Sequence, residues 1–210
     1  MDADFWHAKW HSNQIGFYQT AGNPLLQKHL AALGLTKGAR IFLPLCGKTG
    51  DIAWLLSQGF QVAGAELSPL AIDQLFEDLG LTPTRTAYGD LTKVSATGLD
   101  IFVGDIFDLT LPMLAEVDAV YDRAAYVALP EDIRPKYAQH MQGITAKAPQ
   151  LLITFDYDPS TVSGPPHAIT ATELQATYGA NYTIKTLEVT HPKGGIKGVI
   201  PATETISLLT

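Results

Sequence analysis

Two segments lie close together in the chain: Ala39-Arg40-Ile41-Phe42-Leu43-Pro44-Leu45-Cys46-Gly47-Lys48-Thr49-Gly50-Asp51 and Gly64-Ala65-Glu66-Leu67-Ser68-Pro69. An apolar run ends in a glycine-bearing turn, a helical pattern follows, and a second apolar run at 61–66 ends at Glu66. This order predicts a strand–helix–strand unit with an acidic residue at the tip of its second strand. Such a unit suits a nucleoside, because the turn lets the backbone approach the ligand and the carboxylate accepts hydrogen bonds from both ribose hydroxyls. Glu66 lies 21 positions beyond Leu45, close to the roughly 20 residues that such a unit requires.

The rest of the chain continues the alternation of strands and helices. Apolar runs at 117–121 and 151–155 predict buried strands with a helix between them, and alternating patterns at 182–190 and 204–209 predict a terminal strand pair. Three further strands are expected at 84–88, 91–94 and 99–103, the last two as a hairpin. Capping residues mark helix starts at Asn23, Ser68 and Thr170.

This pattern predicts one α/β domain over residues 1–210. We expect a doubly wound, mostly parallel sheet whose C-terminal strand pair is antiparallel. Ligands of such sheets bind beyond the carboxyl ends of the strands, at the point where the strand order reverses.

Composition argues against several classes of protein. The 210 residues carry a net charge of −7 and no run of Lys or Arg, so a nucleic-acid partner is not expected. Cys46 is the only cysteine, which precludes an intrachain disulfide and suits a cytoplasmic protein. No segment has the composition and length of a membrane span, and the six histidines show no metal-ligand spacing. The expected partner is a small molecule, and the expected state is a cytoplasmic monomer.

The first 23 residues are rich in aromatic side chains, with Phe5, Trp6, Trp10, Phe17 and Tyr18 among polar neighbours. So many aromatic rings need cover, which indicates a segment packed on the domain. We predict that residues 1–23 form a lid over the cofactor site and exclude water from it.

The turn after the first strand narrows the choice of cofactor. Gly47-Lys48-Thr49 matches the end of a phosphate-binding loop, but Phe42 occupies the place of that loop's first glycine. Leu45 and Cys46 stand where a dinucleotide-binding loop needs its first glycine. A nucleoside cofactor without phosphates fits better, and S-adenosylmethionine is the expected one. Two alternatives stay open: a nicotinamide-dependent oxidoreductase, and a non-catalytic protein that binds a cofactor or a metalloid.

Candidate site residues follow the predicted strands. Glu66 is the candidate for the ribose hydroxyls, against the alternative of a solvated strand end. Asp105, with Ile106 beside it, can accept from an adenine amino group, or can simply be a turn residue. Arg123 can grip a carboxylate or an electron-rich ring atom, or can form a surface ion pair. Asp122 is a candidate base that acts through water.

Several segments together resemble the thiopurine S-methyltransferases, particularly the bacterial branch. The similarity covers about residues 4–190 and rests on Phe5-Trp6-His7-Ala8-Lys9-Trp10, Asn13-Gln14-Ile15-Gly16-Phe17, Leu43-Pro44-Leu45-Cys46-Gly47-Lys48, Gly64-Ala65-Glu66-Leu67-Ser68, Gly104-Asp105-Ile106-Phe107, Tyr121-Asp122-Arg123-Ala124, Asp156-Tyr157 and Gly164-Pro165-Pro166. The resemblance implies a class I methyltransferase fold. It also implies contacts to S-adenosylmethionine from Trp10, Leu45, Glu66 and Arg123, with Arg123 near the acceptor as well. Members of the family methylate aromatic and heterocyclic thiols, and bacterial ones are linked to selenium and tellurium species and to tellurite resistance.

One region departs from the family pattern. The C-terminal strand pair of the family usually carries an Arg-Gly with bulky neighbours, whereas this chain has Gly194-Gly195-Ile196-Lys197-Gly198-Val199. Lys197 is the candidate replacement, but its point charge does not reproduce a planar guanidinium. The expected function is therefore an S-adenosylmethionine-dependent S-methyltransferase that acts on a small thiol, with the acceptor preference open.

Overall fold

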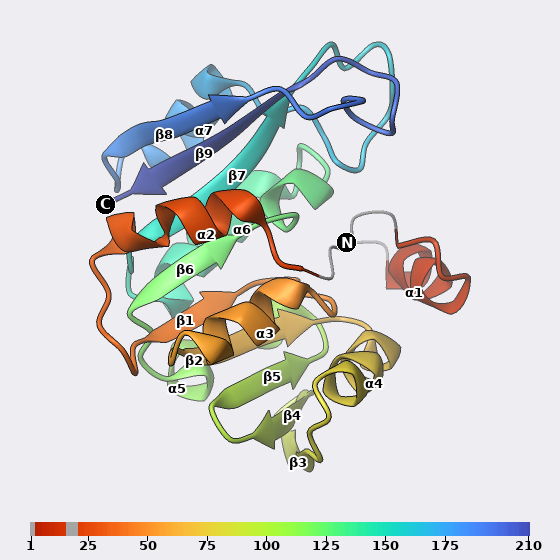
Figure 1. Cartoon of the computed structure of the whole chain (residues 1–210), viewed down its shortest axis with the longest axis vertical. Helices are drawn as coiled ribbons and strands as arrows, with labels where there is room; N and C mark the ends of the chain where they lie inside the picture. Colours follow the sequence, from red (N-terminus) through yellow and green to blue (C-terminus); the bar gives the residue numbers. More distant parts are fainter. Residues whose placement is uncertain (1–2, 16–20) are drawn as a thin grey trace.

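The computed structural model describes residues 3–15 and 21–210 (Figure 1). In this part of the chain, nine strands form one sheet in the order β3-β4-β5-β2-β1-β6-β7-β9-β8. The strands are β1 (Arg40–Leu43), β2 (Gln61–Glu66), β3 (Thr84–Tyr88), β4 (Leu91–Ala96), β5 (Leu99–Val103), β6 (Ala119–Asp122), β7 (Gln150–Asp156), β8 (Ile184–Thr190) and β9 (Thr203–Leu209). The helices are α1 (Ala3–His11), α2 (Pro24–His29), α3 (Gly50–Ser57), α4 (Pro69–Asp78), α5 (Leu111–Leu114), α6 (Arg134–Ile144) and α7 (Ala171–Tyr178), with short 3-10 helices η1 (Leu30–Leu33), η2 (Ile106–Asp108) and η3 (Tyr126–Ala128).

The centre of the sheet is parallel and doubly wound, as predicted. β1 pairs in parallel with β2 on one side and with β6 on the other. β5 extends the sheet beyond β2, and β7 extends it beyond β6. The strand order therefore reverses at β1, so the carboxyl ends of β1, β2 and β6 surround the place where such sheets bind ligands.

The whole sheet is more mixed than predicted. Four pairings are parallel, and four are antiparallel: β3–β4, β4–β5, β7–β9 and β8–β9. The expectation of a mostly parallel sheet holds only for its centre, because antiparallel strands extend the sheet at both edges. The expected C-terminal strand pair is present, and β9 lies between β7 and β8.

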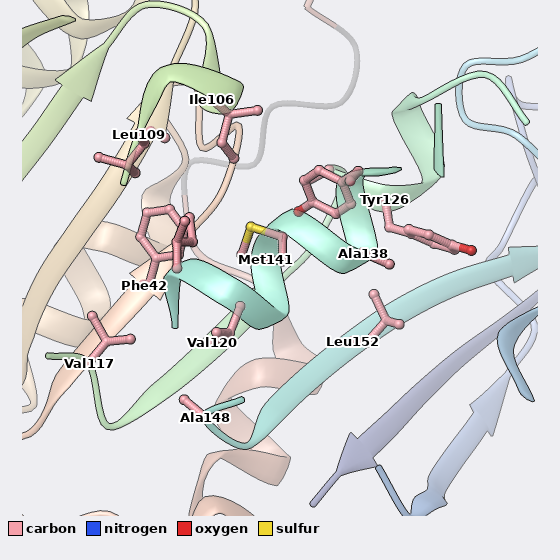
Figure 2. Packing of buried hydrophobic residues seen from close by; sticks show 14 of the residues in the cluster. Phe42, Ile106, Leu109, Val117, Val120, Tyr126, Ala138, Met141, Ala148 and Leu152 are labelled. Carbon is pink, nitrogen blue, oxygen red and sulfur yellow. The ribbon is translucent and has the colours of Figure 1, made fainter. Parts of the chain in front are cut away.

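Helices cover both faces of the central strands. Ile41 and Leu43 of β1 pack in one core cluster with apolar residues of α2, α3 and α4. Phe42, which points to the opposite face, packs in a second cluster with residues of α5, α6 and α7. Figure 2 shows Phe42 within this second cluster, together with Met141 of α6. Burial on both faces explains why the central strands appear in the sequence as continuous apolar runs.

Candidate active site

A cavity of about 680 Å³ lies over the carboxyl ends of β1, β2 and β6. Its volume falls within the roughly 300–1,000 Å³ of small-molecule sites. One wall comes from α1, which lies on the side toward which the central strands point (Figure 1). The side chains in its lining include Trp10, Leu45, Cys46, Asp51, Glu66, Tyr121, Arg123, Phe155, Ile196, Lys197 and Glu204.

Glu66 presents a buried carboxylate to this cavity from the end of β2. It is only 6% exposed, and its two oxygens accept hydrogen bonds from the backbone N–H groups of Gly47 (2.8 Å) and Ser68 (2.9 Å). Burial raises the pKa of Glu66, while these backbone donors oppose the rise. Each carboxylate oxygen can accept a further hydrogen bond, so the group fits the ribose diol of a nucleoside.

The turn after β1 brings Leu45 and Trp10 to the same part of the cavity. Leu45 and Gly47 have positive φ angles of 45° and 53°. A Cβ atom added to Gly47 would lie 2.9 Å from Cζ2 of Trp10, so the missing side chain is what lets the ring pack on the turn. Trp10, on α1, is only 4% exposed. The first part of the predicted lid therefore lies against the cavity, while Phe17 and Tyr18 fall outside the described residues.

Arg123 and Asp122 separate at the end of β6. Arg123 lines the cavity, whereas Asp122 is 1% exposed and does not. The Asp122 carboxylate accepts hydrogen bonds from the Tyr126 backbone N–H (3.0 Å) and from the Tyr137 hydroxyl (2.7 Å). Burial raises the pKa of Asp122 to about 6. With both oxygens held by internal donors, Asp122 is placed to hold the loop that presents Arg123, and the geometry gives no support to its role as a base.

Asp105 and Ile106 do not belong to the cavity lining. The Asp105 carboxylate accepts a hydrogen bond from the Phe107 backbone N–H at 3.0 Å and caps η2. This is the hydrogen bond expected of a turn residue. Ile106 is 2% exposed and packs in the core cluster that contains Phe42. Both residues nevertheless follow β5 directly beside the end of β2, where the Gly104 backbone N–H donates a hydrogen bond to the Glu66 carbonyl at 2.9 Å. Their role at the adenine stays a prediction.

The polar residues in the lining that were not proposed as site residues from the sequence include Asp51, Tyr121 and Glu204. The Tyr121 hydroxyl is buried and has no hydrogen-bond partner within residues 3–15 and 21–210. Burial, and next the neighbouring charge of Asp51, raise its pKa well above the ordinary value. Tyr121 reaches the site through the direction of its side chain on β6, and Glu204 reaches it through the pairing of β9 with β7. Neither is readable from local sequence patterns.

Lys197 lies at the rim of the cavity on the loop between β8 and β9. Its Nζ donates a hydrogen bond to the Ser163 backbone carbonyl at 3.0 Å, which ties the two loops at this rim together. The described part of the chain contains no group of three or more potential metal ligands. None of its helices is long and apolar enough to cross a membrane.

Comparison with known proteins identifies the family. The thiopurine S-methyltransferase family model matches residues 1–198. The thiopurine S-methyltransferase of Xanthobacter autotrophicus is 50% identical over 210 residues, which cover 100% of this chain and 99% of the relative. The enzyme of the same name from Gluconobacter oxydans is 47% identical over 205 residues, covering 98% of this chain and 93% of the relative.

Solved structures show the same fold at low identity. The 1,6-didemethyltoxoflavin-N1-methyltransferase of Burkholderia thailandensis, solved with S-adenosylhomocysteine, superposes with a TM-score of 0.67 at 15% identity, covering 99% of this chain and 87% of that one. Magnesium protoporphyrin IX methyltransferase from Synechocystis, also with S-adenosylhomocysteine, gives a TM-score of 0.63 at 14% identity, covering 99% of this chain and 98% of that one. The fold is thus that of class I methyltransferases. Together with the family match, this sets aside the oxidoreductase and non-catalytic alternatives, and the chain belongs to the thiopurine S-methyltransferase family of S-adenosylmethionine-dependent enzymes.

Proposed function

We propose that the chain methylates the sulfur of small aromatic or heterocyclic thiols of the thiopurine type. The observation that carries the cofactor half of the proposal is Glu66, a buried carboxylate fixed by two backbone N–H groups at the floor of the cavity. The names of the relatives support the acceptor half. Trp10, Leu45, Glu66 and Arg123 are the proposed contacts to S-adenosylmethionine, and all four line the cavity.

The chain's own contribution is to align two reactants and to exclude water. S-adenosylmethionine, when bound, supplies an electrophilic methyl group on a sulfonium sulfur. Glu66 fixes the nucleoside part, and Trp10 covers the turn beside it. Arg123 can hold the carboxylate of the cofactor or stabilise negative charge on the acceptor sulfur. Because a thiolate and a sulfonium neutralise each other as the bond forms, alignment in a dry site supplies most of the required catalysis.

The finer expectations from the sequence belong to the same proposal. Residues 1–210 form a single methyltransferase domain in which residues 1–23 act as a lid. The protein works in the cytoplasm as a monomer, and its net charge of −7 argues against a nucleic-acid partner. Selenium and tellurium species are further candidate acceptors, as in the bacterial branch of the family.

A methyl-transfer screen tests this proposal. S-adenosylmethionine with a labelled methyl group is offered with thiopurines, thiophenols, selenite, tellurite and amines. We expect label in S-methyl products of the aromatic and heterocyclic thiols and none in the amines. Glu66→Gln should weaken S-adenosylhomocysteine binding by about 1–3 kcal/mol, the scale of a hydrogen bond to a charged group. Label in the amines alone would contradict the acceptor assignment, and unchanged binding would remove Glu66 from the site.

A further inference from the structure

The cavity has a second end, away from Glu66, that is built from the C-terminal third of the chain. Phe155 of β7 and Glu204 of β9 are direct partners in the antiparallel register, so their side chains lie on the same face of the sheet. Both line the cavity, as does Ile196 from the loop between β8 and β9. β1, β6 and β7 separate β9 from β2, so this end is distinct from the nucleoside end. Apolar walls beside one carboxylate suit a flat ring that carries an N–H group.

Glu204 is held in place but not saturated with hydrogen bonds. Within residues 3–15 and 21–210, its carboxylate accepts one side-chain hydrogen bond, from the Thr190 hydroxyl at 3.3 Å. The second oxygen can accept from a ligand. Burial raises the pKa of Glu204, while the Thr190 hydroxyl and the charge of Arg123 lower it. A carboxylate with a raised pKa is a stronger base than one in water.

We propose that Glu204 accepts the ring N–H proton of a heterocyclic thione, and that it thereby acts as the base of the reaction and selects acceptors whose sulfur neighbours such an N–H. This inference rests on the proposed function, because it takes a heterocyclic thiol as the acceptor. Heterocyclic thiols carry their hydrogen largely on the ring nitrogen, as C=S thiones. Methylation of that sulfur must therefore release a proton from nitrogen.

The proposed step forms one S–C bond and breaks one S–C bond and one N–H bond. The π pair of the C=S bond forms the new S–CH₃ bond, while the bond between the methyl group and the sulfonium sulfur breaks and its electron pair stays on that sulfur. The N–H bonding pair becomes the second bond of C=N. The proton passes to a carboxylate oxygen of Glu204 and then to solvent.

The other polar groups near this end are poorly suited to take the proton. The guanidinium of Arg123 has donors only and no acceptor for a proton. Burial keeps the Tyr121 hydroxyl protonated by raising its pKa. Asp51 belongs to α3, which follows β1, and its carboxylate accepts hydrogen bonds from the Asn23 backbone N–H (2.5 Å) and from the Thr49 hydroxyl (2.9 Å). Among the described residues that line the cavity, Glu204 is the carboxylate carried by the β7–β9 end of the sheet.

Several charged and titratable groups lie around Glu204 and bear on the pH dependence of kcat/KM. Arg123 and Tyr121, at the end of β6, are close enough to interact electrostatically with Glu204. Lys197, on the loop between β8 and β9, lines the same cavity. Asp156 and His191 line a neighbouring hollow that also contains Thr203. Because only the ionised carboxylate accepts a proton, kcat/KM for a thione should fall as the pH drops through the pKa of Glu204. His191→Gln is the control for the histidine and should keep this acidic limb.

The test compares 6-mercaptopurine with 4-nitrothiophenol, whose ring has no N–H. We expect Glu204→Gln to lower kcat/KM for 6-mercaptopurine by about 100-fold and for 4-nitrothiophenol by less than about twofold. In Glu204→Gln, kcat/KM for 6-mercaptopurine should no longer fall at low pH. The control variant is Glu188→Gln, which removes a carboxylate on β8 that lies outside the cavity and pairs with Lys28 and His29. It should leave kcat/KM unchanged for both acceptors.

A binding measurement accompanies the kinetics. Calorimetry should show unchanged S-adenosylhomocysteine affinity in Glu204→Gln, and 6-mercaptopurine should bind the resulting complex about tenfold more weakly than in the wild type. Equal kinetic losses with both acceptors, or full activity on the purine, would overturn the proposal. If Glu204→Gln does not fold, Glu204→Asp replaces it, and a profile without an acidic limb in that variant overturns the proposal. A wild type that methylates neither thiol would instead refute the proposed function.

Discussion

At the scale of single residues, two buried carboxylates at the ends of β2 and β6, the strands on either side of β1, have different surroundings. Glu66 lines the cavity, and its hydrogen bonds come from backbone groups that leave capacity for a ligand. Asp122 does not line the cavity, and its carboxylate accepts hydrogen bonds from the Tyr126 backbone N–H and the Tyr137 hydroxyl inside the protein. A strand-end carboxylate therefore does not by itself mark a ligand contact, because the direction of the side chain decides.

The raised pKa of Asp122 predicts how the stability of the protein depends on pH. Its pKa is about 6 in the folded protein against 3.8 for the ordinary group, so the folded state holds the proton more tightly. The contribution of Asp122 to the free energy of unfolding is fully present below pH 4. It is lost as the pH rises through about 6, and the total loss is about 3 kcal/mol. Denaturant unfolding of wild type and Asp122→Asn at pH 4 and pH 7 checks this, and the wild type should lose stability relative to the variant. Equal changes in the two proteins would refute it.

The place of Arg123 in the cavity lining predicts a role in recognising the acceptor or the cofactor. Arg123→Lys keeps the charge but loses the planar guanidinium, so it separates charge from geometry. If Arg123 acts mainly on the acceptor, the variant binds S-adenosylmethionine normally and loses about tenfold in kcat/KM for a thiopurine, roughly 1.4 kcal/mol. Steady-state kinetics and calorimetry decide. Weak cofactor binding with equal losses for all acceptors would assign Arg123 to the cofactor carboxylate, and full activity would exclude both roles.

At the scale of elements, the turn after β1 and helix α1 act together. The absent side chain of Gly47 makes room for the ring of Trp10, which packs α1 against the turn after β1. Other features of the elements, namely strand ends and a helix cap, were predictable from the local sequence. The strands at 61–66, 84–88 and 99–103 end at the predicted residues, and Ser68 caps α4 through its hydroxyl.

The features that could not be predicted depend on distant pairing. Glu204 enters the cavity because β9 lies beside β7, and the sequence indicates only that two terminal strands pair with each other. The Tyr126 and Tyr137 donors that occupy Asp122 come from η3 and α6, whose contacts with β6 are tertiary. The position of a site could be read from strand ends, whereas the orientation of each side chain could not.

The contact between α1 and the cavity predicts protection of the helix by ligand. Trypsin can cut after Lys9, within α1, and after Arg85, in the exposed strand β3. S-adenosylhomocysteine should slow the cut after Lys9 and leave the cut after Arg85 unchanged, because closure over a ligand orders nearby backbone. Mass spectrometry of timed digests measures both. Trp10→Ala should weaken binding more than Trp6→Ala, and equal cleavage with and without ligand would leave α1 as packing only.

At the scale of the whole molecule, the sheet gathers distant parts of the chain around one cavity. Its lining comes from α1, the turn after β1, the ends of β2 and β6, and the loop before β9. In the proposed arrangement, the parallel centre holds the nucleoside through Glu66. The antiparallel edge provides the other end, with Phe155 and Glu204. The account therefore assigns cofactor and acceptor to two halves of one sheet.

A crystal structure of the complex with S-adenosylhomocysteine tests this assignment most directly. The account predicts both ribose hydroxyls within about 2.6–3.2 Å of the Glu66 carboxylate oxygens. It also predicts the cofactor sulfur facing the end of the cavity that contains Phe155 and Glu204. A ribose bound away from Glu66, or a sulfur that faces away from β7 and β9, would contradict it.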